Sequence, residues 1–308
     1  MININEKNDK ILNIEITKDS YTYKDLDNIF IIFTSYNGIL TLIYSTKNKS
    51  IISYDLNNFK LIIEIKNAHI DEFVTNFNHF FDKYKKVDLV LSISCTNRVI
   101  NIFNNKNWEL ILTLNNIYSL GRINSACFIQ TDLDKNAFII TSNNYFSLPE
   151  SVKIFNLKGE NIRTYNYLIS YDYIQNNRYK KYISPKSKIH YSFKIIEENN
   201  KIKLISSSMI GIINIWDFHS SELLQKFIIS NNSLYGICLL NKSEIIISSN
   251  NTIILFNILT GKKIETFSGF NNWICCIDLI EHKIYGKCFI SQGIKNEQIK
   301  LLKINDLL

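Results

Sequence analysis

The 308-residue sequence has little of what helices and phosphate-binding loops need: nine glycines, two prolines (Pro149 and Pro185) and three alanines (Ala68, Ala126 and Ala137). Nine glycines leave little material for glycine-rich phosphate loops, and no such motif is present. Scarce alanine with abundant isoleucine disfavours long helices and favours strands. Hydrophobic residues make up 46% of the chain, so a sizeable core can form and global disorder is excluded.

The sequence also lacks an N-terminal leader or membrane-spanning run. Residues 1–10 are polar, and the apolar run at residues 11–16 is interrupted by Asn13 and Glu15, which makes it too short for either role. The cysteines lie within apolar runs and lack disulfide-framework spacing, which indicates reduced core thiols. They are Cys95, Cys127, Cys238, Cys275, Cys276 and Cys288. These features predict a cytoplasmic protein, with the nucleus as an alternative location.

Catalytic and metal-binding motifs are absent as well. No nucleophile elbow and no His-Glu-x-x-His pattern occurs. Cys275, Cys276, His282 and Cys288 form the only metal-like group, but adjacent strand residues point to opposite faces and the spacing differs from that of zinc sites. We therefore expect no enzyme activity, no bound metal and no cofactor.

The net charge of +7 comes from lysines that are spread along the chain. The densest cluster comprises Lys180, Lys181, Lys186 and Lys188. Dispersed charge favours an ordinary solvated surface. A phosphate-directed binder of RNA or anionic lipid, using this cluster, is the alternative.

A recurring six-residue pattern dominates the chain: apolar-x-apolar-aromatic-(Asp/Asn)-x. Its clearest copy is the strand Ile213-Asn-Ile-Trp-Asp-Phe218, which follows the turn at Gly211. The aromatic-Asp/Asn pairs are Tyr54 with Asp55, Phe103 with Asn104, Phe155 with Asn156, Tyr171 with Asp172, Trp216 with Asp217, and Phe256 with Asn257. A degenerate copy of the pattern at residues 299–304 has Lys303 in the Asp/Asn position. The chain is therefore predicted to repeat one supersecondary unit.

The spacing of this pattern indicates the size of the unit. The Asp/Asn position falls at 55, 104, 156, 172, 217, 257 and 303, giving steps of 49, 52, 16, 45, 40 and 46 residues. Five of these steps suit a four-stranded propeller blade of roughly 40–50 residues. The step of 16 is too short for four strands, so the copy near residues 168–184 is predicted to be a two-strand remnant. The alternative is a ring of six proper blades in which this segment is a decorated loop.

These residues resemble the WD40 β-propeller family. The resemblance rests on Ile213-Asn-Ile-Trp-Asp-Phe218, on the Thr260-Gly261 turn and on Phe267-Ser-Gly269. The family's Asp–His–Ser/Thr–Trp hydrogen-bond chain is incomplete here, with at best His190, Ser206 or Ser207, and Trp216 retained. Membership implies an all-β, single closed propeller.

The predicted propeller spans residues 1–308 and has six full blades plus a truncated seventh. A lone strand at residues 10–17 would pair with the last blade and close the ring, because closure removes unpaired edges. The blades are expected near residues 29–66, 73–115, 124–167, 168–184 (truncated), 190–230, 234–268 and 273–304.

The resemblance also implies a non-catalytic scaffold or adaptor that displays binding loops to a protein or peptide partner, within a multi-subunit complex. The residues expected on its binding face are Arg98, Arg122, Tyr145, Lys188 and Trp273. Arg and Trp are frequent hot-spot residues. Trp273 could instead cap an apolar strand, and Arg98 could be a solvated turn residue. A substrate-recognition subunit of a ubiquitin ligase, working through a separate adaptor, is an alternative function.

Overall fold

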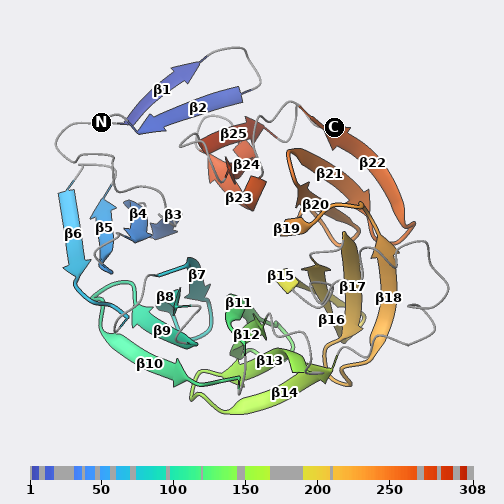
Figure 1. Ribbon diagram of the computed structural model, residues 1–308, viewed down its shortest axis with the longest axis horizontal. Coiled ribbons are helices and arrows are strands. Elements are labelled where there is room, and N and C mark those ends of the chain that lie inside the picture. The colour runs from blue at the N-terminus through green and yellow to red at the C-terminus, as the bar shows by residue number, and fades with distance from the viewer. Residues whose placement is uncertain are drawn as a thin grey trace. The chain divides into compact units, whose positions relative to one another are not determined.

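The computed structural model is built from antiparallel β-strands (Figure 1). It describes residues 2–6, 11–16, 31–36, 39–45, 49–55, 60–69, 74–94, 98–118, 121–143, 150–166, 190–208, 211–268, 274–282, 286–293 and 299–303. The prediction of an all-β chain is confirmed. In these ranges no helix has the length and apolar character to cross a membrane.

One compact unit, Tyr23–His190, contains three four-stranded sheets. The first consists of β3 (Ile31–Tyr36), β4 (Ile39–Ser45), β5 (Ile51–Asp55) and β6 (Lys60–Ile65). The second consists of β7 (Asn76–Asp82), β8 (Val87–Ser94), β9 (Val99–Asn104) and β10 (Leu110–Asn115). The third consists of β11 (Ile123–Gln130), β12 (Ala137–Asn143), β13 (Glu150–Asn156) and β14 (Asn161–Asn166). In each sheet, strands consecutive in sequence pair with one another.

The other unit, Met1–Thr22 with Tyr191–Leu308, contains three further sheets. One has β15 (His190–Glu198), β16 (Lys201–Ser208), β17 (Ile212–Asp217) and β18 (Leu223–Ile228). The next has β19 (Leu234–Leu239), β20 (Glu244–Ser249), β21 (Thr252–Asn257) and β22 (Lys262–Phe267). The third has the order β1 (Ile2–Glu6), β2 (Ile11–Ile16), β25 (Ile299–Lys303), β24 (Gly286–Gly293) and β23 (Ile274–His282).

The predicted single closed propeller is wrong. The strands form separate antiparallel sheets, none of which closes on itself, and the chain divides into two compact units. The expected pairing of the N-terminal strand with the last set is present, since Ile14 of β2 pairs with Ile299 of β25. That pairing enlarges one sheet, whose terminal strands are β1 and β23, and closes no ring. The predicted remnant at residues 168–184 lies outside the described residues.

The strand β1 was not predicted, because residues 1–10 are polar overall. It pairs with β2 in antiparallel register, with Ile2 opposite Ile16 and Ile4 opposite Ile14. Two isoleucines at a spacing of two residues are enough to match the alternation of β2. The strand was missed because the overall polarity of residues 1–10 was considered and the alternation of Ile2 and Ile4 was not.

The repeated aromatic-Asp/Asn pair ends the third strand of each four-stranded sheet. Phe103, Phe155, Trp216 and Phe256 are buried there. The next residue accepts a hydrogen bond on its side-chain oxygen from the backbone N–H two residues later. These bonds join Asn104 to Lys106 (2.9 Å), Asn156 to Lys158 (2.9 Å), Asp217 to His219 (2.9 Å) and Asn257 to Leu259 (3.0 Å). The aromatic therefore anchors the strand, and the Asp or Asn shapes the turn that follows. Tyr171 and Asp172 lie outside the described residues.

Neighbouring sheets within each unit share an apolar core. Ile93 and Ile102 of the second sheet pack with Phe128 and Ile139 of the third sheet. In the other unit, Ile213 of β17 packs with residues of β19, β20 and β21, including Phe256. Strands β8 and β12 are buried along nearly their whole length, so both faces of these inner strands are covered.

Gly211 holds the turn between β16 and β17 in a conformation that no other residue fits. Its φ is +78°, and its carbonyl accepts hydrogen bonds from the N–H groups of Ile229 (2.8 Å) and Ser230 (3.2 Å). An added Cβ would lie 1.8 Å from the carbonyl oxygen of Ser230. The turn and the end of β18 therefore depend on the missing side chain.

We expect Gly211→Ala to lower the free energy of unfolding by about 3 kcal/mol or more, because strain at positive φ adds to a backbone clash. Gly159→Ala is the matched control, since Gly159 also has positive φ (+88°) but its Cβ would meet only leucine side chains, 3.2 Å away at the nearest. Its cost should be about 1 kcal/mol. Denaturant unfolding of both variants measures the difference, and equal losses would contradict the clash.

Candidate functional site

The loop between β10 and β11 is held by side chains from two neighbouring turns and strands. Arg98, in the turn between β8 and β9, donates a hydrogen bond from its guanidinium to the Tyr118 carbonyl oxygen (3.0 Å). Lys153 of β13 donates from its ammonium to the Ile117 carbonyl oxygen (3.1 Å), and this ammonium lies 5.1 Å from the centre of the Tyr118 ring. Two cations therefore clamp the same short stretch of backbone.

Tyr118 fastens this loop from inside. Its side chain is buried, and its hydroxyl contacts both the carbonyl oxygen (2.9 Å) and the hydroxyl (2.8 Å) of Thr141 on β12. A buried tyrosine that satisfies its hydroxyl adds both apolar area and a fixed orientation. The loop is thus attached to the second sheet by Arg98 and to the third sheet by Tyr118 and Lys153.

The preceding loop, before β7, is attached in the same way. Buried His69 places its Nε2 2.8 Å from the hydroxyl of Ser92 on β8. His69 and Ser92 are 23 residues apart, the same separation as between Tyr118 and Thr141. The backbone carbonyl beside His69, that of Ala68, accepts a hydrogen bond from the Asn101 amide nitrogen (2.7 Å). These two loops are therefore equivalent structures, one anchored by histidine and one by tyrosine.

Both arginines predicted for the binding face lie at this end of the unit. Arg98 is half-buried and helps to build the loop, so it is neither a solvated turn residue nor a fully exposed contact. Arg122 is exposed and directly precedes β11, four residues after Tyr118. The predicted residues Tyr145, Lys188 and Trp273 lie outside the described residues. Lys153 was missed, because nothing in the sequence distinguishes it from a surface lysine.

In the other unit, Trp216 makes the hydrogen bond expected of it. Its Nε1 donates to the Ser206 hydroxyl (3.0 Å), and both side chains are buried. Ser206 on β16 and Ser92 on β8 occupy equivalent positions in their sheets. Ser206 is paired with Asn214, and Ser92 is paired with Asn101. The side chain of His190 is not described.

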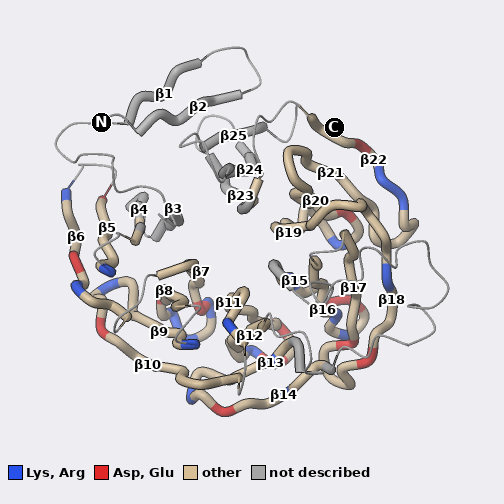
Figure 2. The backbone as a smooth tube through the Cα atoms, in the orientation of Figure 1, with Lys and Arg blue, Asp and Glu red and all other residues tan. Residues whose placement is uncertain are grey.

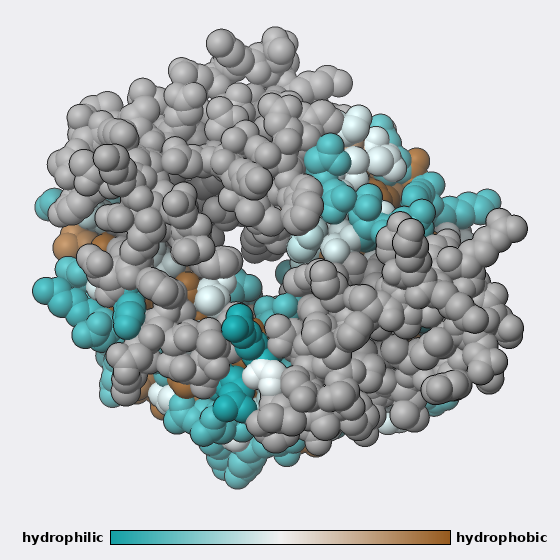
Figure 3. Space-filling model, in the orientation of Figure 1, coloured by the Kyte–Doolittle hydropathy of each residue, from teal (hydrophilic) through white to brown (hydrophobic). Residues whose placement is uncertain are grey.

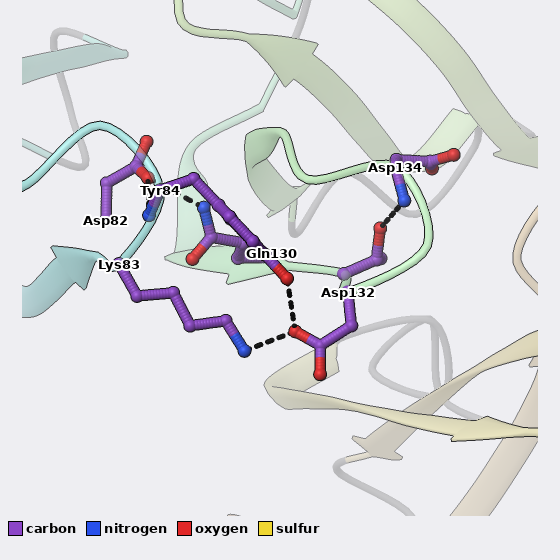
Figure 4. A network of polar contacts seen from close by, with 7 residues as sticks. Asp82, Lys83, Tyr84, Gln130, Asp132 and Asp134 are labelled. Atoms are coloured by element: carbon purple, nitrogen blue, oxygen red, sulfur yellow. Dashed lines mark hydrogen bonds and ion pairs between the residues drawn. The ribbon is translucent and has the colours of Figure 1, made fainter.

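The opposite ends of the second and third sheets are joined by a network of polar contacts (Figure 4). Lys83 and Tyr84 both donate to the Asp132 carboxylate, and Gln130 donates to Asp82 (2.9 Å). Burial alone would raise the pKa of Asp82, but hydrogen bonds from the Lys85 N–H, Gln130 and the Tyr84 N–H outweigh it and lower the pKa. Both carboxylates accept hydrogen bonds within the network, which therefore connects the turn after β7 to the turn after β11.

His79 and Asp88 form a described contact of a kind that also occurs in catalytic sites. His79 contacts the Asp88 carboxylate at 2.5 Å, and Asn105 donates to the same carboxylate (2.8 Å). Among the described contacts, no hydroxyl or thiol joins this pair as a nucleophile would. Likewise, within the described ranges no three His, Cys, Asp or Glu side chains are grouped so that they could hold a metal ion. The side chains of Cys275, Cys276, His282 and Cys288 are not described.

No family model matches the chain, and no curated protein matches it. Among solved structures, the fold is similar to that of the computationally designed Ika8 protein, with a TM-score of 0.54. The similarity covers 89% of this chain and 70% of that chain, at 12% sequence identity. At this identity the likeness concerns the fold alone.

The anchor at His69 makes stability sensitive to acid. Burial lowers the pKa of His69 from 6.5 to about 4, so the unfolded chain binds the proton more readily than the folded chain. The contribution of neutral His69 to the free energy of unfolding is therefore fully present above pH 6.5 and is lost as the pH drops toward 4. At 1.36 kcal/mol per pH unit, this loss of unfolding free energy amounts to about 3 kcal/mol at pH 4.

His69→Gln keeps a hydrogen-bonding group and removes the titration. We expect wild type to lose about 3 kcal/mol of unfolding free energy relative to His69→Gln between pH 7 and pH 4. Denaturant unfolding at a series of pH values measures it. A constant difference would show that His69 is not buried as a neutral base.

Proposed function

We propose that this chain is a non-catalytic scaffold that binds a protein or peptide partner at the end of the unit that carries Arg98 and Arg122. The observation that supports it best is the rigid attachment of the loop between β10 and β11. Arg98, Lys153 and Tyr118 fasten residues 117 and 118, and β11 begins directly after Arg122, so the loop is restrained at both ends. A loop with restrained ends loses less conformational entropy when a partner binds.

We also infer that the four-stranded units are WD40-like repeats. The Trp216-Asp217 pair, the bond from Trp216 to Ser206 and the loop anchor from His69 to Ser92 support this relationship. A cytoplasmic or nuclear adaptor within a multi-subunit complex is consistent with it. The proposed likeness is between a single four-stranded sheet and a single WD40 repeat, and it does not extend to closure of a ring.

The test is a pull-down from native cytosol with Arg122→Glu, followed by binding of the purified partner to both proteins. Arg98 is left intact because its replacement would loosen the loop itself. Lys106→Glu is the matched control: Lys106 is exposed in the turn between β9 and β10, at the opposite end of β9 from Arg98. We expect Arg122→Glu to weaken partner binding about tenfold or more, as hot-spot arginines do, and Lys106→Glu to leave it unchanged.

The salt dependence of the captured material separates the alternatives. A protein partner retained at high salt and lost with Arg122→Glu supports the scaffold. RNA or anionic lipid that is released by salt would replace it with the phosphate-directed function. An identical set of proteins bound to wild type and Arg122→Glu would reject this end of the unit as the binding face.

A further inference from the structure

Two polar groups lie in the apolar contact between the first and second sheets. One is the hydroxyl of Ser53 on β5, and the other is the indole N–H of Trp108 in the turn between β9 and β10. The two residues are 0% and 6% exposed, and neither polar atom has a hydrogen-bond partner in the part of the chain that the structure describes. A buried donor or acceptor without a partner costs free energy, so each group calls for an explanation.

Ser53 faces the second sheet. It is opposite Ile43 on β4 and opposite Ile63 on β6, and cross-strand partners lie on the same face of a sheet. Ile43 packs in one cluster with Val90 and Phe103 of the second sheet. The third strands of the other four-stranded sheets have a buried aliphatic residue at this position, directly before the aromatic: Ile102, Ile154, Ile215 and Leu255. Ser53 therefore places a hydroxyl where the other sheets bury an aliphatic side chain.

Trp108 is an exception of a second kind. Its φ is +58°, and its backbone N–H donates to the Asn104 carbonyl oxygen (2.7 Å). Two other turns have Ser221 and Gly261 at the equivalent position, with φ of +63° and +69°. A bulky residue at positive φ is strained. The ring of Trp108 packs against that of Phe103, with centroids 6.1 Å apart, in the cluster shared by the two sheets. The strained turn thus carries a ring into the same contact that holds Ser53.

The surroundings of these two groups exclude an ion as their partner. Apolar side chains reach the surface over β6 and β10 (Figure 3), whereas the hydroxyl and the indole N–H lie inside the apolar cluster. Neither β9 nor residues 51–54 of β5 carry a charged side chain (Figure 2), so these strands offer nothing to balance a bound ion. The partner is therefore neutral.

The chemistry of the two groups identifies this neutral partner. An indole N–H only donates, whereas a hydroxyl both donates and accepts. A partner shared by both groups must accept from the indole and also bond to the hydroxyl. Water does both, and buried waters typically bond to polar groups that the protein leaves unsatisfied.

We propose that Ser53 and Trp108 hold a buried water molecule between the first and second sheets. The water accepts a hydrogen bond from Trp108 Nε1 and forms another with the Ser53 hydroxyl. It joins the two sheets by polar bonds across an otherwise apolar contact, and these bonds offset the strain of the turn at Trp108. This site does not depend on the partner-binding face proposed at Arg122.

The first test observes the indole N–H groups of the full, isotope-labelled chain by NMR. Trp108→Phe identifies the Trp108 signal, because that variant lacks it. In wild type we expect a nuclear Overhauser effect between the Trp108 indole proton and water. Trp216 is the internal control: its Nε1 donates directly to the Ser206 hydroxyl (3.0 Å), so its indole proton should show no such effect.

Ser53→Ala should lower the ratio of folded to unfolded chain about tenfold and remove the water effect at Trp108, because the water loses a partner. Denaturant unfolding measures the ratio. A hydroxyl without any partner predicts the opposite sign, since its removal would stabilise the fold. Ser206→Ala is the matched control and should change the Trp216 signal but leave the water effect at Trp108 intact.

The double variant Ser53→Ala/Trp108→Phe tests whether the two residues share one site. Its loss in the folded-to-unfolded ratio should be about fivefold smaller than the product of the two single losses, because either change alone disrupts the same water site.

Three results contradict this water site. If wild type shows no Overhauser effect between Trp108 and water, another part of the protein satisfies the indole. If Ser53→Ala raises stability, the hydroxyl has no partner. If the two single losses multiply in the double variant, the residues do not share a water molecule.

Discussion

The step from third to fourth strand at the aromatic residue is the constraint on which the four-stranded sheets depend. At Trp216 the register places Leu223 opposite the ring and resumes with Gln225 opposite Ile215, so one aromatic faces two residues of the fourth strand. Asp217, directly after the ring, accepts hydrogen bonds from the N–H groups of His219 and Ser220 and so defines the turn. One pair of residues thus ends the third strand, shapes the turn and bends the edge.

The opposite ends of the second and third sheets are built from a different kind of contact. There a loop residue reaches a hydroxyl on the second strand: His69 reaches Ser92, and Tyr118 reaches Thr141. These bonds are buried, where an unsatisfied partner would be costly, so they fix the loops more firmly than surface contacts would. Turns at one end are thus shaped by local side-chain caps, while loops at the other end are fastened to strands distant in sequence.

The repeat of aromatic and Asp/Asn was sufficient to predict where third strands end, because both residues act locally. It could not predict how the sheets assemble, since closure depends on contacts that no single repeat contains. The bulges escaped prediction because register is set between strands, and Leu224 and Ile264 look like ordinary strand residues. The tyrosine anchor was missed because a histidine was expected; the shared separation of 23 residues was the signal that could have revealed it.

The position of the bulge limits how far a further strand could extend along β18. The register is irregular only beside Trp216, and from Gln225 to Ile228 it continues without a shift. The twist at the bulge therefore prevents a long flat strand from adding along the whole edge. Open-ended sheet growth needs such a length. The same two residues that end the third strand and bend the fourth strand therefore also protect the sheet against aggregation.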